Sequence, residues 1–436
     1  MTGKSFSPLA AAAVIVANMV GTGVFTSLGF QLVDIQSGFV LLMLWAVGGV
    51  IALCGAMSYA ELGAALPRSG GEYNFLTRIY HPAMGFVSGW VSATIGFAAP
   101  TALAAITFAT YLSSVFPDLS VRWPAAALVL ALTLVHSTNR RNSGGTQLVF
   151  TVLKVLIILG FSALALVLVD QPQPLRFLPA AGDGALLTSG EFAVSLIYVA
   201  YAYTGWNAAT YLSGELDNPQ RYLPRVLAGG TIVVALLYVL LNWVFLRSAP
   251  IAEMTGQLEV GFIAAQHIFG QRGADAMGVV LALLLVSTVS AMIVAGPRVL
   301  QVIGQDFNAF RMLSICNRNG VPFVAICTQA AISLLFILTS TFESILVFAG
   351  FTLALNSLLT VLGLFVLRWR QPDLERPYRT TGYPVVPLVY LSLTGWTLLF
   401  VLSERPVEGL VGLALVGSGL GFYALTRWLD GRSADT

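Results

Sequence analysis

The stretch Ala17-Asn18-Met19-Val20-Gly21-Thr22-Gly23-Val24-Phe25 places two glycines and a hydroxyl near the middle of an apolar run, residues 8–33. A run of this length predicts a membrane-spanning helix, because about 20 apolar residues cross the hydrocarbon core. Glycine costs about 1 kcal/mol relative to alanine inside a helix and lets the backbone leave it. Unwound backbone at membrane depth is tolerated only where protein covers it or where it lines a cavity. We therefore predict a span that is interrupted at this stretch.

A second run, residues 190–213, contains a similar stretch, Tyr201-Ala202-Tyr203-Thr204-Gly205-Trp206-Asn207. Close helix packing is the competing interpretation of either stretch alone, since glycine also lets membrane helices approach. Interrupted helices in corresponding positions of two halves favour a transporter binding site instead. Freed N–H groups at a half-helix end suit a carboxylate, and freed carbonyls suit an ammonium group, so such a pair can bind a zwitterion without a charged side chain.

The composition excludes a soluble protein. Of 436 residues, 57% are hydrophobic and 10% are charged, whereas a soluble domain carries about 25% charged residues. The net charge of +2 does not suggest nucleic acid as a partner. Three cysteines without metal spacing indicate neither a disulfide framework nor a metal site, and no cofactor is expected.

Uncharged runs between loop signals predict an all-α integral membrane protein with twelve transmembrane helices. The predicted spans are 8–33, 38–66, 83–116, 123–138, 145–169, 190–213, 223–247, 274–300, 321–340, 343–367, 384–402 and 409–427. A short helix, Val260–Phe269, is expected outside the membrane. Spans 1–5 and 6–10 would form two repeats that each begin with an interrupted helix, and five spans per repeat place the second upside down. The predicted units are residues 1–169, residues 190–370, and a final pair of spans in residues 384–428.

The basic residues predict the orientation, because cytoplasmic loops carry an excess of Lys and Arg. With the N-terminus inside, sixteen of the 22 basic residues fall in inner loops and tails, and Lys154 falls inside a span. The outer loops hold Arg122, Arg176, Arg247, Arg272 and Arg405. Both termini are therefore expected in the cytoplasm.

Lys154 lies in an otherwise uncharged run, Leu148–Leu168, about 15 Å from its cytoplasmic end. A long side chain near a helix end can snorkel to the interface, but a depth of about 15 Å is hard for a lysine side chain to span. The alternative is a cation fixed among helices, bonded to opened carbonyls of the first span and to the hydroxyls of Ser287 and Thr288 in the eighth. Such an ammonium would replace a bound sodium ion, and its titration would make the carrier sensitive to protons.

Two other membrane functions are disfavoured. A channel needs a continuous pore with repeated polar rings, whereas the polar groups here cluster at midplane. An intramembrane enzyme is not indicated, because His81, His136 and His267 are too scattered for a metal site and no paired carboxylates lie within the spans. A sensor that binds an amino acid without transporting it would have the same pocket and stays an alternative.

Seven ordered segments resemble the amino acid–polyamine–organocation superfamily and, within it, the L-type amino acid transporter branch. These segments are Val20-Gly21-Thr22-Gly23-Val24-Phe25, Ser58-Tyr59-Ala60-Glu61-Leu62-Gly63, Pro67-Arg68-Ser69-Gly70-Gly71-Glu72-Tyr73, Lys154, Ala202-Tyr203-Thr204-Gly205-Trp206-Asn207, Glu215-Leu216-Asp217-Asn218-Pro219-Gln220-Arg221 and Gln371-Pro372-Asp373-Leu374-Glu375-Arg376-Pro377-Tyr378. The resemblance implies the leucine-transporter fold with 5+5 inverted repeats, and amino acid transport by alternating access.

The resemblance also assigns site residues. Main-chain N–H groups of Gly21, Thr22 and Gly23 would receive the substrate carboxylate, with the Tyr201 ring as an outer gate. Carbonyls for the amino group would come from Tyr201, Tyr203, Thr204 and Gly205, while Asn18 and Asn207 complete the expected binding set. Lys154 matches the lysine that takes the place of sodium, which implies exchange or proton-linked transport rather than sodium symport.

A cytoplasmic gate is expected from charged residues at inner helix ends, namely Glu61, Arg68, Glu215 and Arg221. The competing interpretation is that these charges face water, where ion pairs contribute little. The outer loop Phe116-Pro117-Asp118-Leu119-Ser120-Val121-Arg122-Trp123 has no cysteine. In animal members of this branch a cysteine there links an ancillary subunit, so no disulfide-linked partner is expected.

The predicted function is a sodium-independent amino acid permease or exchanger in the plasma (inner) membrane. The regions around the two breaks contain neither an acidic side chain nor an arginine, which favours small or medium neutral L-amino acids. A carrier for cationic amino acids or amines is the alternative within the same fold.

Overall fold

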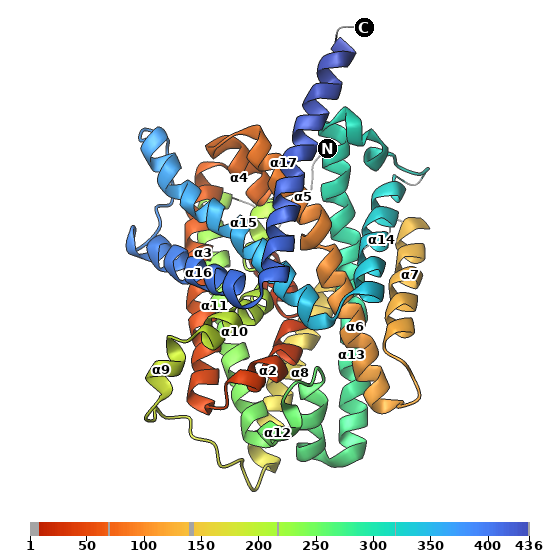
Figure 1. Cartoon of the computed structure of the whole chain (residues 1–436), viewed down its shortest axis with the longest axis vertical. Helices are drawn as coiled ribbons and strands as arrows, with labels where there is room; N and C mark the ends of the chain where they lie inside the picture. Colours follow the sequence, from red (N-terminus) through yellow and green to blue (C-terminus); the bar gives the residue numbers. More distant parts are fainter. Residues whose placement is uncertain (1–7, 69, 139–143, 216–217, 319, 435–436) are drawn as a thin grey trace.

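The computed structural model describes residues 8–68, 70–138, 144–215, 218–318 and 320–434, and the described chain is helical without a strand (Figure 1). The α-helices are α1 (Pro8–Met19), α2 (Gly23–Asp34), α3 (Gly38–Ala65), α4 (Gly71–Ile79), α5 (Pro82–Val91), α6 (Ala98–Val115), α7 (Arg122–Thr138), α8 (Gly144–Leu168), α9 (Asp183–Leu187), α10 (Gly190–Ala202), α11 (Pro219–Ser248), α12 (Ile251–Met254), α13 (Val260–Asp306), α14 (Phe323–Thr339), α15 (Phe342–Arg370), α16 (Val385–Glu404) and α17 (Pro406–Ala434). One π-helical turn, η1 (Ser92–Gly96), and two 3₁₀ segments, η2 (Ala208–Glu215) and η3 (Asn308–Ser314), complete the order.

Each predicted span coincides with a helix or with an interrupted pair of helices. Within the described residues, nine helices are long and apolar enough to cross a membrane, with α1 and α2 counted together. Two shorter apolar helices, α10 and α14, join them, whereas α7 falls in neither group. The all-helical, multi-span architecture is therefore confirmed, and the count of twelve crossings stays a prediction.

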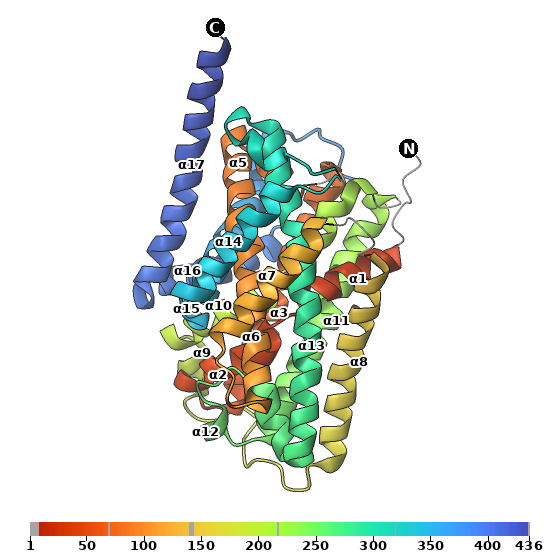
Figure 2. The same ribbon diagram turned by 90° about the vertical axis from the view of Figure 1, so that its right-hand side faces the viewer.

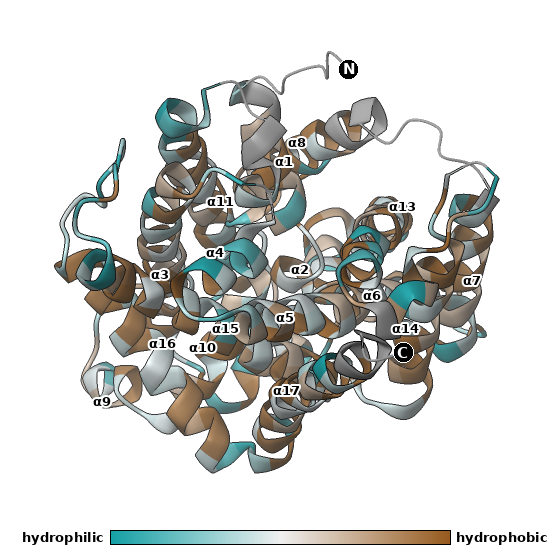
Figure 3. Cartoon of the chain, turned by 90° about the horizontal axis from the view of Figure 1, so that it is seen from above, coloured by the Kyte–Doolittle hydropathy of each residue, from teal (hydrophilic) through white to brown (hydrophobic). Residues whose placement is uncertain are grey.

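The outward faces of the peripheral helices carry exposed apolar side chains, as lipid requires. Examples are Leu134 on α7, Leu156 and Val167 on α8, and Leu399 on α16. Figure 3 shows α7 and α16 coloured mainly as hydrophobic at the rim of the bundle. In Figure 2, α8 and α17 lie on opposite sides of the molecule. These helices form the outer shell around the interrupted spans.

The predicted interruption of the span 190–213 is confirmed, because α10 ends at Ala202 and the chain resumes as η2. The predicted short helix Val260–Phe269 is also present, as the first part of α13, and Gly270 with φ 71° and ψ −179° separates it from the rest. Two other local features were not predicted. The third span contains the π-helical turn η1, and π-bulges are frequent at functional sites. Helix α4 forms where only a loop was expected.

The interrupted spans lie at the centre of the packing. Helix α11 packs along α3 and α1, and α10 packs against α2, α3, α15 and α16. Helix α13 packs along α6 and reaches α2 and α8. The break between α1 and α2 thereby faces the end of α10.

Candidate functional site

The first break comprises Val20–Thr22, which lie between the end of α1 and the start of α2. The Gly21 N–H donates to the Met19 carbonyl at 2.8 Å, and the Phe25 N–H donates to the Thr22 carbonyl at 3.0 Å. The turn leaves carbonyls near the end of α1 to find partners outside the helix, since the last carbonyls of a helix have none within it. Side chains from α8 and α11 supply those donors.

The second break comprises Tyr203–Asn207, between α10 and η2. Gly205 has φ +98°, a left-handed conformation that favours glycine. A Cβ at this position would also lie 2.8 Å from the backbone carbonyl carbon of Asn18. The Thr204 hydroxyl donates to the Tyr201 carbonyl at 2.7 Å, and the Thr204 N–H donates to the same carbonyl at 3.0 Å. Glycine is thus required here by both conformation and space.

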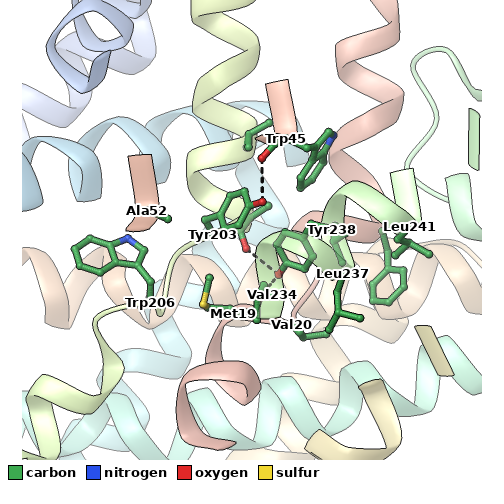
Figure 4. Packing of buried hydrophobic residues seen from close by; sticks show 14 of the residues in the cluster. Met19, Val20, Trp45, Ala52, Tyr203, Trp206, Val234, Leu237, Tyr238 and Leu241 are labelled. Carbon is green, nitrogen blue, oxygen red and sulfur yellow. Dashed lines mark hydrogen bonds between the residues drawn. The ribbon is translucent and has the colours of Figure 1, made fainter. Parts of the chain in front are cut away.

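The two breaks touch each other. A Cβ on Gly23, the first residue of α2, would lie 2.5 Å from the Cα of Ala202, the last residue of α10. The Tyr238 hydroxyl on α11 lies within hydrogen-bond distance of the Met19 carbonyl and 3.0 Å from the Ala202 carbonyl (Figure 4). One hydroxyl proton therefore serves two carbonyls, one from each interrupted span.

Lys154 is buried and bonds directly to the first break. Its ammonium donates to the Val20 carbonyl at 3.0 Å and to the Thr288 hydroxyl at 2.9 Å. These are the two kinds of partner that the sequence predicted for it. The Ser287 hydroxyl instead donates to the Leu284 carbonyl of its own helix at 2.7 Å. Of the two hydroxyls expected beside the lysine, the structure places only that of Thr288 in hydrogen-bond contact with it.

A cavity of about 10 Å³ lies against the first break, which is room for about one water molecule. Its lining residues are Gly21, Phe25, Tyr111, Lys154, Leu281, Leu284, Leu285 and Thr288. An amino acid zwitterion is several times larger than water. In the structure this space is therefore closed to an amino acid, although Gly21, one of the expected main-chain donors, lines it.

Several side chains expected to bind substrate are engaged with the protein. The Asn18 amide donates to the Val14 carbonyl at 2.8 Å, and the Tyr203 hydroxyl donates to the Trp45 carbonyl at 3.0 Å (Figure 4). The Tyr201 ring is buried, with its hydroxyl facing Thr22. The main chain of both breaks is thus better placed than these side chains to recognise a solute.

One member of the expected cytoplasmic gate, Glu61, is bonded to residues outside the predicted set, and the gate itself stays a prediction. Glu61 is fully buried, and its carboxylate accepts from Arg368 at 2.9 and 2.7 Å and from the Thr380 N–H at 2.7 Å. The Arg376 guanidinium is 3.5 Å away. Arg68 and Arg221 are exposed, and Arg221 lies over the ring of Tyr222. The side chain of Glu215 lies outside the described residues. Glu61 is therefore an anchor between α3 and α15 rather than a partner of Arg221, because its oxygens are already occupied.

Glu72 is a site residue that the sequence analysis missed, since no acidic side chain was expected near the breaks. Its side chain is 2% exposed. The carboxylate accepts from the Tyr59 hydroxyl at 3.0 Å and also from the Asn207 amide and the Tyr211 hydroxyl. The signal was the spacing of Glu72 with Phe75, Leu76 and Ile79, which puts the acid on the apolar face of a short helix.

Comparison with known proteins agrees with this geometry. A family model described as "Amino acid permease" matches residues 6–411. The mouse large neutral amino acids transporter small subunit 2 is 27% identical over 431 aligned residues, covering 97% of this chain and 81% of the relative. The human b(0,+)-type amino acid transporter 1 is 29% identical over 436 residues, with 97% and 88% covered. The mouse Asc-type amino acid transporter 1 is 26% identical over 431 residues, with 97% and 81% covered.

The family match extends over nearly the whole chain, including both breaks, Lys154 and Glu72. These relatives are transporters rather than enzymes. Together with the apolar spans and the paired main-chain breaks, the match shows that this chain belongs to the amino acid permease family.

Proposed function

We propose that the chain is a sodium-independent permease or exchanger for small or medium neutral L-amino acids, working by alternating access. The observation that carries the proposal is the contact between the two breaks, with the Lys154 ammonium bonded to the Val20 carbonyl. Main-chain groups there are free of the helical ladder and suit a zwitterion. The ammonium supplies at this point the fixed positive charge that a sodium ion would otherwise provide.

The preference for neutral side chains rests on charge. Glu72 is the acid nearest the second break, but its two oxygens already accept three hydrogen bonds from the protein. It therefore presents no free carboxylate to a cationic substrate in the closed site. The relative named for large neutral amino acids supports a neutral substrate.

The architecture that we propose is the leucine-transporter fold, with residues 1–169 and 190–370 as inverted repeats and residues 384–428 as the last two spans. Both halves begin with an interrupted helix, α1/α2 and α10/η2. We place the protein in the plasma (inner) membrane, with both termini in the cytoplasm. The asymmetry of basic residues between alternate loops supports this orientation.

An ancillary subunit is a separate question, because one relative is named a small subunit. We propose that no partner is attached by a disulfide through the loop 116–123, which has no cysteine. Cys54 is buried, while Cys316 is exposed and precedes α14. Non-reducing electrophoresis of the protein from its native membrane tests this, and a band that collapses to the monomer on reduction would contradict it.

The proposed function is tested by counterflow in proteoliposomes. Vesicles loaded with unlabelled alanine in sodium-free buffer should accumulate external labelled alanine, and replacing choline by sodium should change nothing. Leucine and serine should compete, while arginine, glutamate and diamines should not. A pure sensor would show binding without accumulation, and tight competition by arginine would assign the chain to cationic substrates.

A further inference from the structure

We propose that two carboxylates, Glu72 and Glu343, latch the sixth span (α10 with η2) on the two sides of its break, and that the site opens to one side when the latch on that side is released. This inference rests on the proposed alternating-access function, for which it supplies the gates. Both latches are engaged in the closed structure, and each holds a tyrosine of the sixth span.

The first latch is Glu72, on the α4 side. It receives hydrogen bonds from Asn207, in the second break, and from Tyr211, in η2. Tyr59 on α3 completes the set at 3.0 Å. The carboxylate thus holds the segment that follows the break, and Asn207 connects it directly to the expected binding site.

The second latch is Glu343, which holds the part of the span that precedes the break. It accepts from the Tyr198 hydroxyl of α10 at 2.7 Å and from Arg405 at 2.7 Å. Tyr198 lies one turn before Tyr201. The Phe30 ring of α2 stacks against Phe342 with centroids 5.8 Å apart and lies 5.9 Å from Tyr198. Helix α2, which follows the first break, therefore packs directly against Tyr198 and against Phe342, the neighbour of Glu343.

The two latches are linked through the long helix α15. Glu343 lies in its first turn. Towards its other end, α15 is joined to α4, which carries Glu72, by two hydrogen bonds of 3.0 Å each. The Tyr80 hydroxyl, directly after α4, donates to the Leu359 carbonyl, and Arg370 donates to the Ile79 carbonyl. A helix of 29 residues is about 44 Å long. The sixth span is thus held on both sides of its break by two connected helices, and opening either side requires one of the latches to break.

The chemistry suits a reversible contact. Glu61 is bound by a bidentate guanidinium and a backbone N–H, which makes it a permanent anchor. The hydrogen-bond donors to Glu72 are two phenols and an amide, all neutral. Glu343 accepts from the Tyr198 phenol and from the Arg405 guanidinium, and the side chains of this ion pair are 32% and 37% exposed to solvent. Water can replace neutral donors, or the partners in an exposed ion pair, far more easily than the partners in a buried ion pair.

The test uses a thiol reporter at the cavity beside the first break. Leu285 lines that cavity, so Leu285→Cys is placed in a background whose three native cysteines are changed to serine. A membrane-impermeant thiol reagent is applied to oriented vesicles from either side, without substrate. Glu72→Gln should raise the labelling rate from the cytoplasmic side, where we place α4, and Glu343→Gln should raise it from the outer side, each by about three- to tenfold.

Matched controls remove a carboxylate that does not hold the sixth span. Asp306 accepts from Tyr73 of α4 at 2.7 Å, and Glu253 pairs with His267 in an outer loop. Asp306→Asn and Glu253→Gln should leave the side preference of labelling unchanged. If a glutamate variant fails to fold, Tyr211→Phe and Tyr198→Phe remove one donor from each latch and carry the same test.

The outcomes separate this inference from the proposed function. Opposite shifts in side preference support the latches even if no amino acid is transported, because labelling needs no substrate. Unchanged labelling, or an equal rise from both sides in either variant, would overturn the latches while leaving the transport assay to decide the function.

Discussion

The two breaks interrupt their spans with the same residue type, but the protein holds them by different chemistry. The first break is bonded through its main chain to the buried Lys154 ammonium, and the chain returns at once to α-helix in α2. The second break is held by side chains, among them Thr204 and Asn207, and continues as the 3₁₀ segment η2.

This difference indicates which of the two interrupted spans can move when the site opens. A buried ammonium cannot leave its partners without a large desolvation cost, so the first break is pinned to α8 and α13. The contacts of the second break are hydroxyls and amides on carbonyls and a carboxylate, which exchange at lower cost. We therefore expect the sixth span to carry most of the gating motion and the first break to keep its shape.

The largest expected effect is at the pinned break. Lys154→Ala removes the donor to Val20 and Thr288, so we expect counterflow to fall about tenfold or more. Expression and monodispersity in detergent should stay near the unsubstituted level, which separates transport from folding. Lys154→Arg, which keeps the charge, should retain more activity than Lys154→Ala. If the Lys154→Ala variant kept full uptake at every pH, Lys154 would have only a packing role.

The contact between the breaks gives the next effect. Gly23→Ala would place a Cβ 2.5 Å from the Ala202 Cα, so α2 and α10 must separate. We expect a loss of about 1–3 kcal/mol of stability, measured by thermal unfolding in detergent. Gly21→Ala is the matched control, because its Cβ would meet only the Met19 carbonyl at 3.9 Å. Equal melting temperatures for the two variants would show that the breaks do not touch.

A smaller effect is expected where one hydroxyl joins the two breaks. Tyr238→Phe removes the donor shared by Met19 and Ala202. Since two buried carbonyls compete for that proton, we expect a loss of about 1–2 kcal/mol. Thermal unfolding again measures it, and a stability equal to that of the unsubstituted protein would mean that other donors satisfy both carbonyls.

The smallest effect is expected on the second break alone. Tyr203→Phe removes a single hydrogen bond to the Trp45 carbonyl, so the expected loss is about 1 kcal/mol or less. The Tyr238 variant should therefore be less stable than the Tyr203 variant. The reverse order would indicate that the second break, not the first, is the more firmly held.

Much of the candidate site was predictable from local sequence. The glycines at 21, 23 and 205 indicated where the helices end, because a helix interior disfavours them. Lys154 was conspicuous because a lone charge in an apolar run needs a partner. Its contacts with the first span and Thr288 follow from that need.

Other contacts depend on segments far apart in the chain. Glu61 bonds to Arg368, and Glu72 bonds to Asn207 and Tyr211. In each pair the partners are more than a hundred residues apart in the sequence. Sequence spacing describes one helix at a time, so it could place Glu72 on an apolar face but not name what covers that face. The same limit explains why Thr288 rather than Ser287 meets Lys154.

By itself, the sequence determined that the chain spans a membrane, where its helices are interrupted, and that one buried cation must be compensated. Those properties follow from the cost of placing charge and unpaired backbone in lipid, which each segment meets on its own. Only the tertiary structure decided that the two breaks touch, that Tyr238 joins them, and that Glu72 of α4 and Glu343 of α15 bond to the sixth span on either side of its break. These contacts arise from the packing of whole helices, whose angles and registers are set by many distant side chains together.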